Sequence, residues 1–580
     1  MEADRSAGEV AAGSIQKESE RLAGFGGKEE VLCPGRDRVR VCRASSWVGV
    51  CVIQDCLREK GMGRQTADQE GRPIGKDTLY QLSDPGKYFD GILHVQGCKL
   101  TGFGEMPAGK VIMPYFRAMN AQFLLAAAHS GAGKTTVTLG LLRALQKRGH
   151  RVQPFKCGPD YIDPIHHRTA AGRDSINLDR YMMSDAHIRS LYARYGTNAD
   201  ICITEGVMGL YDGSRKMAGS SAEIAMLLDL PVILILNAKA MAYTAAAILY
   251  GMKNFCPGVR IAGVLFNFVE TASHYRLLQE ACDDVGVTPL GHLPTQPALR
   301  IPSRHLGLDT TVAEEAIRAA AEHVEEYIDL EGLIKLTEVG AVDRAEEAGL
   351  DAEGAGLRSA VSEQKGLPGE SPGPGKTILV ARDEAFHFLY PENIRWLEQW
   401  GRVRYFSPLR DERLVVDDPE LIYLPGGYPE LHLEALAGNS SLLEQLRAYH
   451  ARGGKILAEC GGMMYLGKYI ADEKGKPYAM TGILDIGTSM ERKKLHLGYR
   501  TVTVGGSILK GHEFHYSSLV ESGGGLVGGG GGLVRGGGNL VGGVAEQVYC
   551  NDRVLASYMH FYWGEEAGAV EDWLKMTRSR

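Results

Sequence analysis

Residues 131–136 read Gly-Ala-Gly-Lys-Thr-Thr, and this stretch decides the fold of the region around it. It follows an apolar run at residues 123–128 and precedes an amphipathic stretch that ends at residues 148–149. A strand, a glycine-rich turn, a Lys-Thr pair and a helix together cradle a polyphosphate, because backbone N–H groups and the helix N-terminus face the anion. Lys134 neutralises phosphate charge, and the Thr135 hydroxyl is placed for Mg²⁺. The predicted nucleotide site consists of Ser130, Gly131, Gly133, Lys134, Thr135, Thr136 and, from the next strand, Lys156.

Length and composition limit what the chain can be. Its 580 residues are too many for one hydrophobic core and suggest roughly three or four domains. The net charge of −7 argues against nucleic acid as a partner, because no basic stripe is present to neutralise phosphates. The 11 cysteines form no CxxC pairs, which fits reduced thiols in a cytosol. No signal peptide is apparent, and charged or polar residues interrupt the apolar stretch 226–250, so we expect a soluble cytoplasmic enzyme without a membrane partner.

Strand-like and helical patterns alternate in two regions of the chain. Near-continuous Val/Ile/Leu strands separated by helices predict a doubly wound parallel sheet with helices on both faces, whose ligands collect at the carboxyl ends of the strands. The strands predicted in the first region are residues 123–128, 152–155, 201–204, 232–236 and 261–266. Those predicted in the second region are residues 377–381, 403–406, 421–424 and 455–458.

These patterns predict a domain order. Residues 1–112 show no sustained period and are read as an extension of unknown fold, partly disordered. A nucleotide-binding domain spans 113–337, a Gly/Pro/Glu-rich linker spans 338–376, and a second α/β domain spans 377–580. Residues 523–543 form a glycine tract, read as a mobile insertion in a surface loop.

Carboxylates follow two strands of the first region. In the turn at residues 156–164, Lys156 is predicted to face the γ-phosphate of the nucleotide. In the loop at residues 204–213, Glu205 is the natural partner of Mg²⁺ because it directly follows a buried strand. The predicted metal ligands are Thr135, Glu205 and Asp163, and the predicted substrate contacts are Asp160, Tyr161, Asp163 and Asp212.

A cysteine opens a helix in the second region. Residues 455–464 form an apolar strand, then Cys460, then small residues, which is the pattern of a nucleophile elbow. We expect the helix dipole to lower the pKa of the Cys460 thiol. His560 is the predicted base, and the N–H groups of Gly427 and Gly461 are predicted to bind the oxyanion.

Two further histidines, His512 and His515, stand at a spacing that metal ligands also use. No third ligand is evident in the sequence, so a strand or loop with hydrogen-bonded histidines near the domain interface is the favoured interpretation.

Taken together, these motifs resemble the cobyrinate a,c-diamide synthase family over residues 122–567. The matching stretches are residues 129–136, 156–164, 205–213, 381–386, 406–411, 459–466 and 511–516. The resemblance implies an ATP-dependent amidoligase domain similar to dethiobiotin synthetase, followed by a class I glutamine amidotransferase-like domain. It implies that ATP and Mg²⁺ activate the a and c acetate carboxylates of cobyrinate, a corrinoid, and that L-glutamine supplies ammonia. It leaves a homodimer open as the assembly.

Three positions depart from the family pattern. Ala128 stands where the loop has its first glycine, which alanine can replace if its φ is negative. Asn237 stands where many relatives have aspartate, and Tyr562 stands where the superfamily has the glutamate that orients the catalytic histidine. A Cys460–His560 dyad without a third member is therefore expected.

Three alternatives stay open at this point. The same chemistry on hydrogenobyrinate or Ni-sirohydrochlorin differs only in the tetrapyrrole. A phosphate-loop switch ATPase with an inert amidotransferase-like domain would show no glutaminase activity. A non-catalytic corrinoid-binding protein would bind the pigment without consuming ATP.

Overall fold

The computed structural model describes most of the chain from residue 121 onward. The described ranges are 121–296, 299, 314–338, 376–504, 506–520, 533–535 and 547–576, with four short strands before them: β1 (Arg43–Ala44), β2 (Trp47–Val48), β3 (Ile92–Leu93) and β4 (Val111–Ile112). The chain divides into two units, Met1–Tyr115 and Phe116–Arg580. Apart from those strands, strand β22 (Leu533–Arg535) inside the glycine tract and the ends of each segment, the predicted extension 1–112, linker 338–376 and glycine tract 523–543 lie outside the described residues, so these predictions stay untested.

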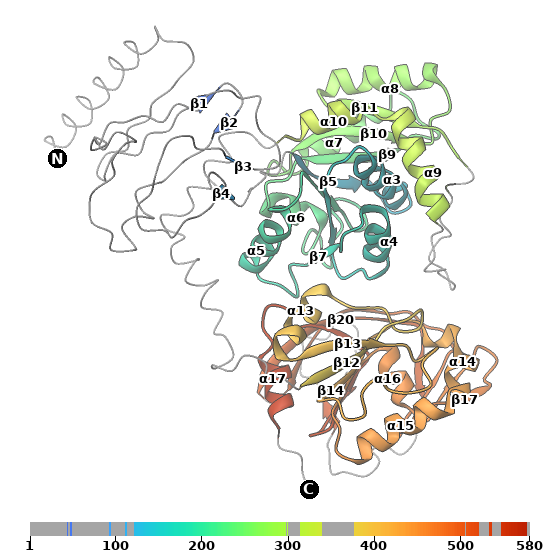
Figure 1. Cartoon of the computed structure of the whole chain (residues 1–580). Coiled ribbons are helices and arrows are strands. Elements are labelled where there is room, and N and C mark those ends of the chain that lie inside the picture. The colour runs from blue at the N-terminus through green and yellow to red at the C-terminus, as the bar shows by residue number, and fades with distance from the viewer. Residues whose placement is uncertain are drawn as a thin grey trace, which may run out of the picture. The chain divides into compact units, whose positions relative to one another are not determined.

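The nucleotide-binding half is built on seven parallel strands in the order β11-β10-β9-β5-β8-β6-β7 (Figure 1). All five predicted strands are confirmed, and two further strands, β7 and β11, extend the sheet. The strands are β5 (Ala121–Ala127), β6 (Val152–Cys157), β7 (Ile176–Leu178), β8 (Ile201–Glu205), β9 (Val232–Asn237), β10 (Ile261–Asn267) and β11 (Thr288–Leu293).

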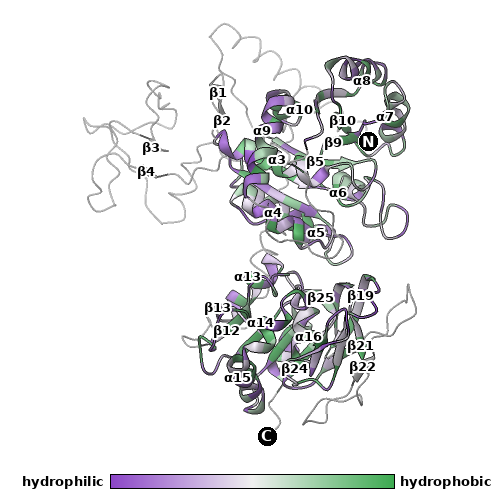
Figure 2. Ribbon diagram, turned by 90° about the vertical axis from the view of Figure 1, so that its right-hand side faces the viewer, coloured by the Kyte–Doolittle hydropathy of each residue, from purple (hydrophilic) through white to green (hydrophobic). Residues whose placement is uncertain are grey.

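Helices cover both faces of this sheet, because successive side chains of each buried strand point to opposite sides. Phe123 and Leu125 of β5 pack with α3, α9 and α10. Leu124 and Ala126 pack with α5, α6, α7 and α8. Figure 2 shows that these helices carry both hydrophilic and hydrophobic residues, as expected of helices with one face on a sheet. The helices are α3 (Lys134–Lys147), α4 (Ile162–Ala171), α5 (Asp185–Gly196), α6 (Ser221–Leu227), α7 (Ala245–Asn254), α8 (Ala272–Val285), α9 (Glu314–Tyr327) and α10 (Leu330–Leu336).

The second half has its own seven-stranded sheet, in the order β13-β12-β14-β15-β24-β23-β22. Strands β13 to β24 of that order are parallel neighbours, whereas β23 and β22 add antiparallel pairs at one edge. The four predicted strands are confirmed. The strands are β12 (Thr377–Ala381), β13 (Arg402–Phe406), β14 (Leu421–Leu424), β15 (Ile456–Glu459), β22 (Leu533–Arg535), β23 (Gln547–Cys550) and β24 (Val554–Ser557).

Two small sheets and several helices complete this half. An antiparallel sheet joins β19 (His496–Val504), β20 (Ser507–His515) and β25 (Met559–Tyr562), and a four-stranded sheet has the order β17-β16-β18-β21. The strands of the latter are β16 (Tyr469–Ala471), β17 (Pro477–Ala479), β18 (Gly487–Ser489) and β21 (Ser518–Val520). The helices are α13 (Pro391–Trp400), η2 (Pro429–Leu431), α14 (Leu433–Gly438), α15 (Ser440–Ala451), α16 (Gly461–Leu466) and α17 (Gly568–Lys575).

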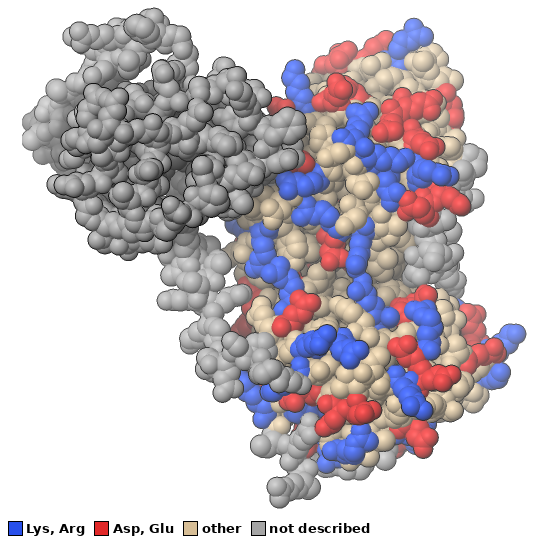
Figure 3. Space-filling model, in the orientation of Figure 1, with Lys and Arg blue, Asp and Glu red and all other residues tan. Residues whose placement is uncertain are grey.

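The surface carries charges of both signs. Acidic and basic side chains are interspersed over the described part of the face drawn in Figure 3. Among the described residues, no helix has both the length and the apolar character needed to cross a bilayer.

Candidate active site

The glycine-rich loop connects β5 to α3 as the sequence predicts. Gly131 and Gly133 have φ of 80° and 95°, a region that favours glycine, and α3 begins at Lys134. A Cβ atom on Gly133 would lie 2.2 Å from Nδ2 of Asn267, whose amide donates a hydrogen bond to the Ala132 carbonyl at 2.9 Å. Asn267, at the end of β10, therefore braces the loop. No motif of the sequence indicated this contact.

Lys134 contacts the loop that follows β8. Its Nζ donates a hydrogen bond to the Met208 carbonyl at 2.5 Å. Met208 has a φ of 48°, so its carbonyl is aimed by an unusual backbone conformation. The structure thus brings the phosphate loop and the loop at residues 204–213 together, as expected from their places at the ends of adjacent strands.

A buried lysine lies among the predicted carboxylates. Nζ of Lys156 is 2.6 Å from Oδ2 of Asp163, 3.0 Å from Oε1 of Glu205 and 4.0 Å from Oδ2 of Asp160. Burial acts to raise the pKa of Glu205, but the positive charge of Lys156 and a hydrogen bond from His167 outweigh it and lower that pKa. Glu205 is therefore ionised, and Lys156 offsets its charge.

His167 is a member of this group that the sequence analysis missed. Its Nε2 lies 2.7 Å from Oε2 of Glu205, and its Nδ1 lies 3.0 Å from Oγ of Ser175. The side chain is fully buried on α4. A histidine in the helix after the Asp160–Asp163 turn carries no sequence signal of its own, because only the fold places it against Glu205.

Contacts link the residues predicted to hold Mg²⁺. The Thr135 hydroxyl donates a hydrogen bond to Oε1 of Glu205 at 2.9 Å, and Glu205 and Asp163 both contact Lys156. Hydroxyl and carboxylate oxygens are the hard donors that Mg²⁺ prefers. The Lys156 ammonium already occupies a position where these oxygens attract positive charge, so the donor set fits the ion.

Two of the predicted substrate contacts also have local structural roles. Oδ1 of Asp160 accepts hydrogen bonds from the backbone N–H groups of Ile162 and Asp163 at 2.9 and 3.2 Å, which caps the start of α4. Oδ2 of Asp212 accepts a hydrogen bond from the Gly209 N–H at 3.1 Å. A role for either carboxylate toward substrate stays a prediction.

Cys460 occupies a strained turn between β15 and α16. Its φ of 47° and ψ of −107° are rare for a residue other than glycine, and its backbone N–H donates to the Ser557 carbonyl at 2.7 Å. A Cβ atom on Gly461 would lie 3.2 Å from the backbone nitrogen of Gly427, so the two predicted oxyanion donors are neighbours. The turn has the shape of the predicted nucleophile elbow.

The prediction that the helix dipole lowers the pKa of the Cys460 thiol is wrong. Burial raises the pKa of Cys460 strongly, and the nearby carboxylate of Glu430 raises it further, while a hydrogen bond from the Gly461 N–H opposes them. The six-residue helix α16 does not outweigh this desolvation. In the absence of substrate, therefore, Cys460 is a protonated thiol.

His560 lies on β25, fully buried, and makes no hydrogen bond to the Cys460 sulfur, which instead donates to the Phe514 carbonyl at 3.8 Å. Neither ring nitrogen has a hydrogen-bond partner among the described residues. Burial and the nearby His512 and His515 hold the pKa of His560 well below its usual range, so the ring is neutral. A neutral imidazole is the form that accepts a proton, and catalytic hydrogen bonds often tighten only when substrate binds.

The two halves of the site meet at Tyr161. Its ring centroid lies 5.0 Å from that of His560, 5.0 Å from that of Phe388 and 4.6 Å from that of Tyr390. Tyr161 belongs to the carboxylate-bearing turn of the nucleotide half, whereas the other three rings belong to the cysteine half. The predicted phosphoryl site and the predicted base of the cysteine thus share one aromatic wall.

Polar contacts hold the same boundary. The Tyr562 hydroxyl lies 2.7 Å from Nε2 of His187, so this departure from the superfamily's glutamate contributes to the contact between the halves. Glu392 accepts hydrogen bonds from Arg194 at 2.9 Å and from the Tyr195 hydroxyl at 2.5 Å. These pairs fix the orientation of the two halves around Tyr161.

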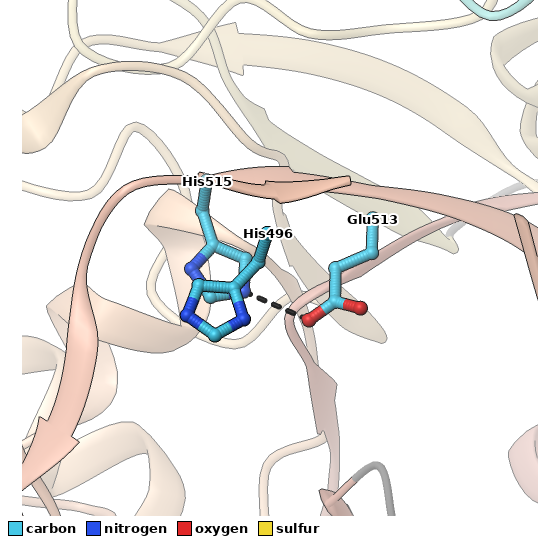
Figure 4. A group of neighbouring side chains, drawn as sticks. All are labelled: His496, Glu513 and His515. Atoms are coloured by element: carbon cyan, nitrogen blue, oxygen red, sulfur yellow. Dashed lines mark hydrogen bonds and ion pairs between the residues drawn. The ribbon is translucent and has the colours of Figure 1, made fainter. Parts of the chain in front are cut away.

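A histidine-rich cluster lies on β19 and β20. The sequence analysis lacked a third ligand beside His512 and His515; the structure instead joins His515 to His496 and Glu513, with ligand atoms within 4.8 Å of one another (Figure 4), and leaves His512 out. The rings of His496 and His515 are stacked 4.7 Å apart at 4°, whereas one ion would have to lie in the plane of both. Arg500 also lies 2.8 Å from Oε2 of Glu513. We therefore assign no metal to this cluster. His515 is hydrogen-bonded to Glu513 and to the Ser517 carbonyl, as the favoured interpretation expects, whereas Nδ1 of His512 has no hydrogen-bond partner among the described residues.

Comparison with known proteins gives two matching families. Residues 123–308 match the CobQ/CobB/MinD/ParA nucleotide binding domain, and residues 377–568 match the CobB/CobQ-like glutamine amidotransferase domain. A hydrogenobyrinate a,c-diamide synthase of Brucella suis biovar 1 (strain 1330) is 41% identical over 69% of this chain and 89% of its own length. A cobyrinate a,c-diamide synthase of Salmonella typhimurium is 37% identical over 80% of this chain and 99% of its own length. Another of that name, from Priestia megaterium, is 35% identical over 79% of this chain and 98% of its own length.

Proposed function

The chain belongs to the family of cobyrinate and hydrogenobyrinate a,c-diamide synthases, and on that basis we propose that it uses ATP and glutamine to amidate the a and c acetate carboxylates of cobyrinate. It is a carbon–nitrogen ligase with glutamine as the nitrogen donor, and it acts in cobalamin biosynthesis. The observation that supports the proposal is the contact of Tyr161 with His560, because Tyr161 belongs to the predicted phosphoryl site and His560 is the predicted base of the cysteine.

The cysteine half releases ammonia. His560 takes the proton of the Cys460 thiol, and the sulfur attacks the carboxamide carbon of glutamine. The N–H groups of Gly427 and Gly461 stabilise the oxyanion of the tetrahedral intermediate. The His560 proton then passes to the departing nitrogen, ammonia leaves, and water releases glutamate from the thioester. The neutral state of His560 and the protonated state of Cys460 are the starting states that this sequence needs.

The nucleotide half activates the acid. An oxygen of the substrate carboxylate attacks the γ-phosphorus of ATP, the bond to ADP breaks, and an acyl phosphate forms. Ammonia attacks the acyl carbon, phosphate leaves, and the product is an amide. Lys134 and Lys156 offset the charge that develops on the phosphoryl group, and Asp160, Tyr161 and Asp212 are proposed to hold the corrinoid edge.

Mg²⁺ belongs to the proposal as a cofactor. Thr135, Glu205 and Asp163 would hold it. When bound there, the ion neutralises charge on the β- and γ-phosphates.

The proposal also has to say which tetrapyrrole is the substrate. The Brucella relative is named for hydrogenobyrinate, whereas the Salmonella and Priestia relatives are named for cobyrinate. We propose cobyrinate, and parallel assays with cobyrinate, hydrogenobyrinate and Ni-sirohydrochlorin decide between them. A higher kcat/KM for either of the other two would replace our choice. The predicted domain limits, a cytoplasmic location and a homodimer are further proposals.

The decisive experiment separates the two nitrogen sources. Cys460→Ala should abolish amidation driven by glutamine and leave amidation driven by ammonium chloride intact, with product followed by mass spectrometry. Cys256→Ala, which changes a half-buried free cysteine of the nucleotide half, is the matched control. If Cys460→Ala keeps its glutamine-driven turnover, or if ammonium fails to rescue it, the proposed division of labour is wrong. If the unaltered protein shows no glutaminase activity, the switch ATPase alternative replaces the proposed amidase function.

A further inference from the structure

The two carboxylate oxygens of Glu205 face different groups. Oε1 accepts a hydrogen bond from the Thr135 hydroxyl at 2.9 Å and lies 3.0 Å from Nζ of Lys156. Oε2 lies 2.7 Å from Nε2 of His167. Glu205 is fully buried, so its oxygens need partners inside the protein. One oxygen therefore faces the phosphate loop and Lys156, and the other faces helix α4.

Helix α4 presents this histidine beside one of the predicted metal ligands. Asp163 and His167 occupy positions i and i+4 of α4, so their side chains lie on the same side of the helix. Asp163 contacts Nζ of Lys156 at 2.6 Å, whereas His167 contacts Glu205. Helix α4 thus contributes two side chains to this group, although the proposed reaction uses only Asp163.

The imidazole of His167 is held at both nitrogens. Nδ1 lies 3.0 Å from Oγ of Ser175, which directly precedes β7, and Nε2 contacts Glu205. The side chain of His167 is fully buried, and Ser175 is buried too. Turning the ring over would break both contacts at once. The ring therefore has one fixed orientation toward Glu205.

The direction of the hydrogen bond follows from the charge of Glu205. An ionised carboxylate can only accept, so Nε2 of His167 carries the hydrogen and donates. The separation of 2.7 Å is typical of hydrogen bonds to a charged acceptor, which are about twice as strong as neutral ones. The last torsion of a glutamate side chain has only a weak intrinsic preference. The hydrogen bond from His167 removes this rotational freedom.

We propose that His167 is a positioning residue, which turns the Glu205 carboxylate so that Oε1 faces the proposed Mg²⁺ and nucleotide site. This inference rests on the proposed function, because Glu205 is a proposed Mg²⁺ ligand there. His167 acts through Glu205 and takes no chemical step itself. A ligand that an outer hydrogen bond already orients binds its ion more tightly than one that must first be ordered.

Two substitutions separate the two nitrogens of the ring. The amide nitrogen of glutamine lies as far along the side chain as Nε2, so His167→Gln keeps a donor for Glu205 and loses the group beside Ser175. The amide nitrogen of asparagine lies only as far as Nδ1, so His167→Asn keeps a polar group beside Ser175 and loses the donor to Glu205.

The test measures binding of AMP-PNP, an ATP analogue that is not hydrolysed, to the full-length chain by isothermal titration calorimetry. Each protein is titrated once with MgCl2 and once with EDTA. The gain in affinity on adding MgCl2 should be at least about tenfold smaller in His167→Asn than in the unaltered protein, the low end of the range for loss of an outer hydrogen bond to a metal ligand. His167→Gln should keep most of that gain.

Two controls distinguish positioning from a loosened fold. In EDTA, the variants should bind AMP-PNP as the unaltered protein does, because the glycine-rich loop and Lys134 are unchanged. His150→Asn alters a half-buried histidine that precedes β6, at the amino ends of the strands and away from the site, and should keep the full gain from MgCl2.

Three outcomes would overturn the inference. If His167→Asn keeps the full gain from MgCl2, Glu205 does not need His167. If His167→Gln loses as much of the gain as His167→Asn, a donor at the Nε2 position is not what matters. If His167→Asn weakens AMP-PNP binding equally with MgCl2 and with EDTA, His167 only supports the fold.

Failure of the proposed function would look different. If the unaltered protein shows the expected gain from MgCl2 but amidates no corrinoid with ammonium chloride, the proposed function is wrong while the role of His167 stands. If the unaltered protein shows no gain from MgCl2, both the proposed Mg²⁺ site and the role of His167 are refuted.

Discussion

Gly426→Ala should disable the glutaminase and spare the ligase. Gly426 packs against the imidazole of His560, and a Cβ atom on it would lie 2.1 Å from Cε1 and 2.7 Å from Nδ1 of that ring. Carbon atoms approach comfortably to about 3.5 Å, so the ring must retreat by more than about 1 Å. His560 is fully buried, so it has no open space into which to move without disturbing Phe388 and Tyr161.

The size of the effect follows from this displacement. A misplacement of about 1 Å in a catalytic constellation costs on the order of 100-fold in rate. Overpacking of a buried site also costs about 1–3 kcal/mol of stability, which leaves a protein of this size folded. We therefore expect kcat for glutamine hydrolysis to fall by about 100-fold, with a small decrease in the urea midpoint.

The assay measures both nitrogen sources on one preparation. Glutamate release reports the glutaminase, and corrinoid amidation with ammonium chloride reports the ligase, which should be unchanged. Gly438→Ala is the matched control, because a Cβ atom there meets nothing within 4 Å. If Gly426→Ala hydrolyses glutamine within twofold of the unaltered protein, His560 is not the base, and another residue must activate Cys460.

Three further predictions concern other parts of the site. Lys156→Gln removes the charge that offsets Glu205, so amidation from either nitrogen source should fall at least about 100-fold while glutamate release persists; unchanged ammonium-driven amidation would exclude the proposed role. Glu392→Gln weakens the contact between the halves, so more ammonia should escape per amide formed than in the exposed control Glu398→Gln; equal ratios would show that this contact does not matter for transfer. Burial raises the pKa of Glu459 from the ordinary value of 4.5 to about 8 in the folded protein. The contribution of this group to the free energy of unfolding should therefore fall as the pH rises from about 4.5 to about 8. Urea unfolding should therefore show a steeper loss with pH than in Glu459→Gln, by up to about 1.4 kcal/mol per pH unit, and parallel curves would contradict the raised pKa.

The parts of the site that lie in one continuous stretch could be predicted from the sequence. The phosphate loop before α3 and the elbow at Cys460 each combine an apolar strand, small residues and a helix start within about ten residues. Glu205 and Lys156 both follow or end predicted strands, so the sequence places them at one edge of the sheet, because parallel strands bring their carboxyl ends together. Their 3.0 Å contact was not predicted.

The parts that depend on distant contacts could not be predicted. His167, Asn267 and His496 reach the sites described here only through packing between separate elements, and nothing in their neighbouring residues signals it. The thiol pKa of Cys460 was predicted in the wrong direction because the sequence shows the start of a helix but not the burial of the sulfur beside Glu430. The contact between Tyr161 and His560 joins residues far apart in the chain.

The shared aromatic wall also limits how the chain can be divided. Tyr161 comes from one half, and Phe388, Tyr390 and Tyr562 from the other; all four rings belong to one hydrophobic cluster. Each buried aromatic side chain hides about 150–250 Å² of surface from water. Two fragments produced separately would each expose this apolar surface, and the hydrophobic effect would favour their association. A fusion of the glutaminase half to a different ligase would accordingly need a ligase surface that carries an equivalent of Tyr161. A flexible linker alone would not be enough.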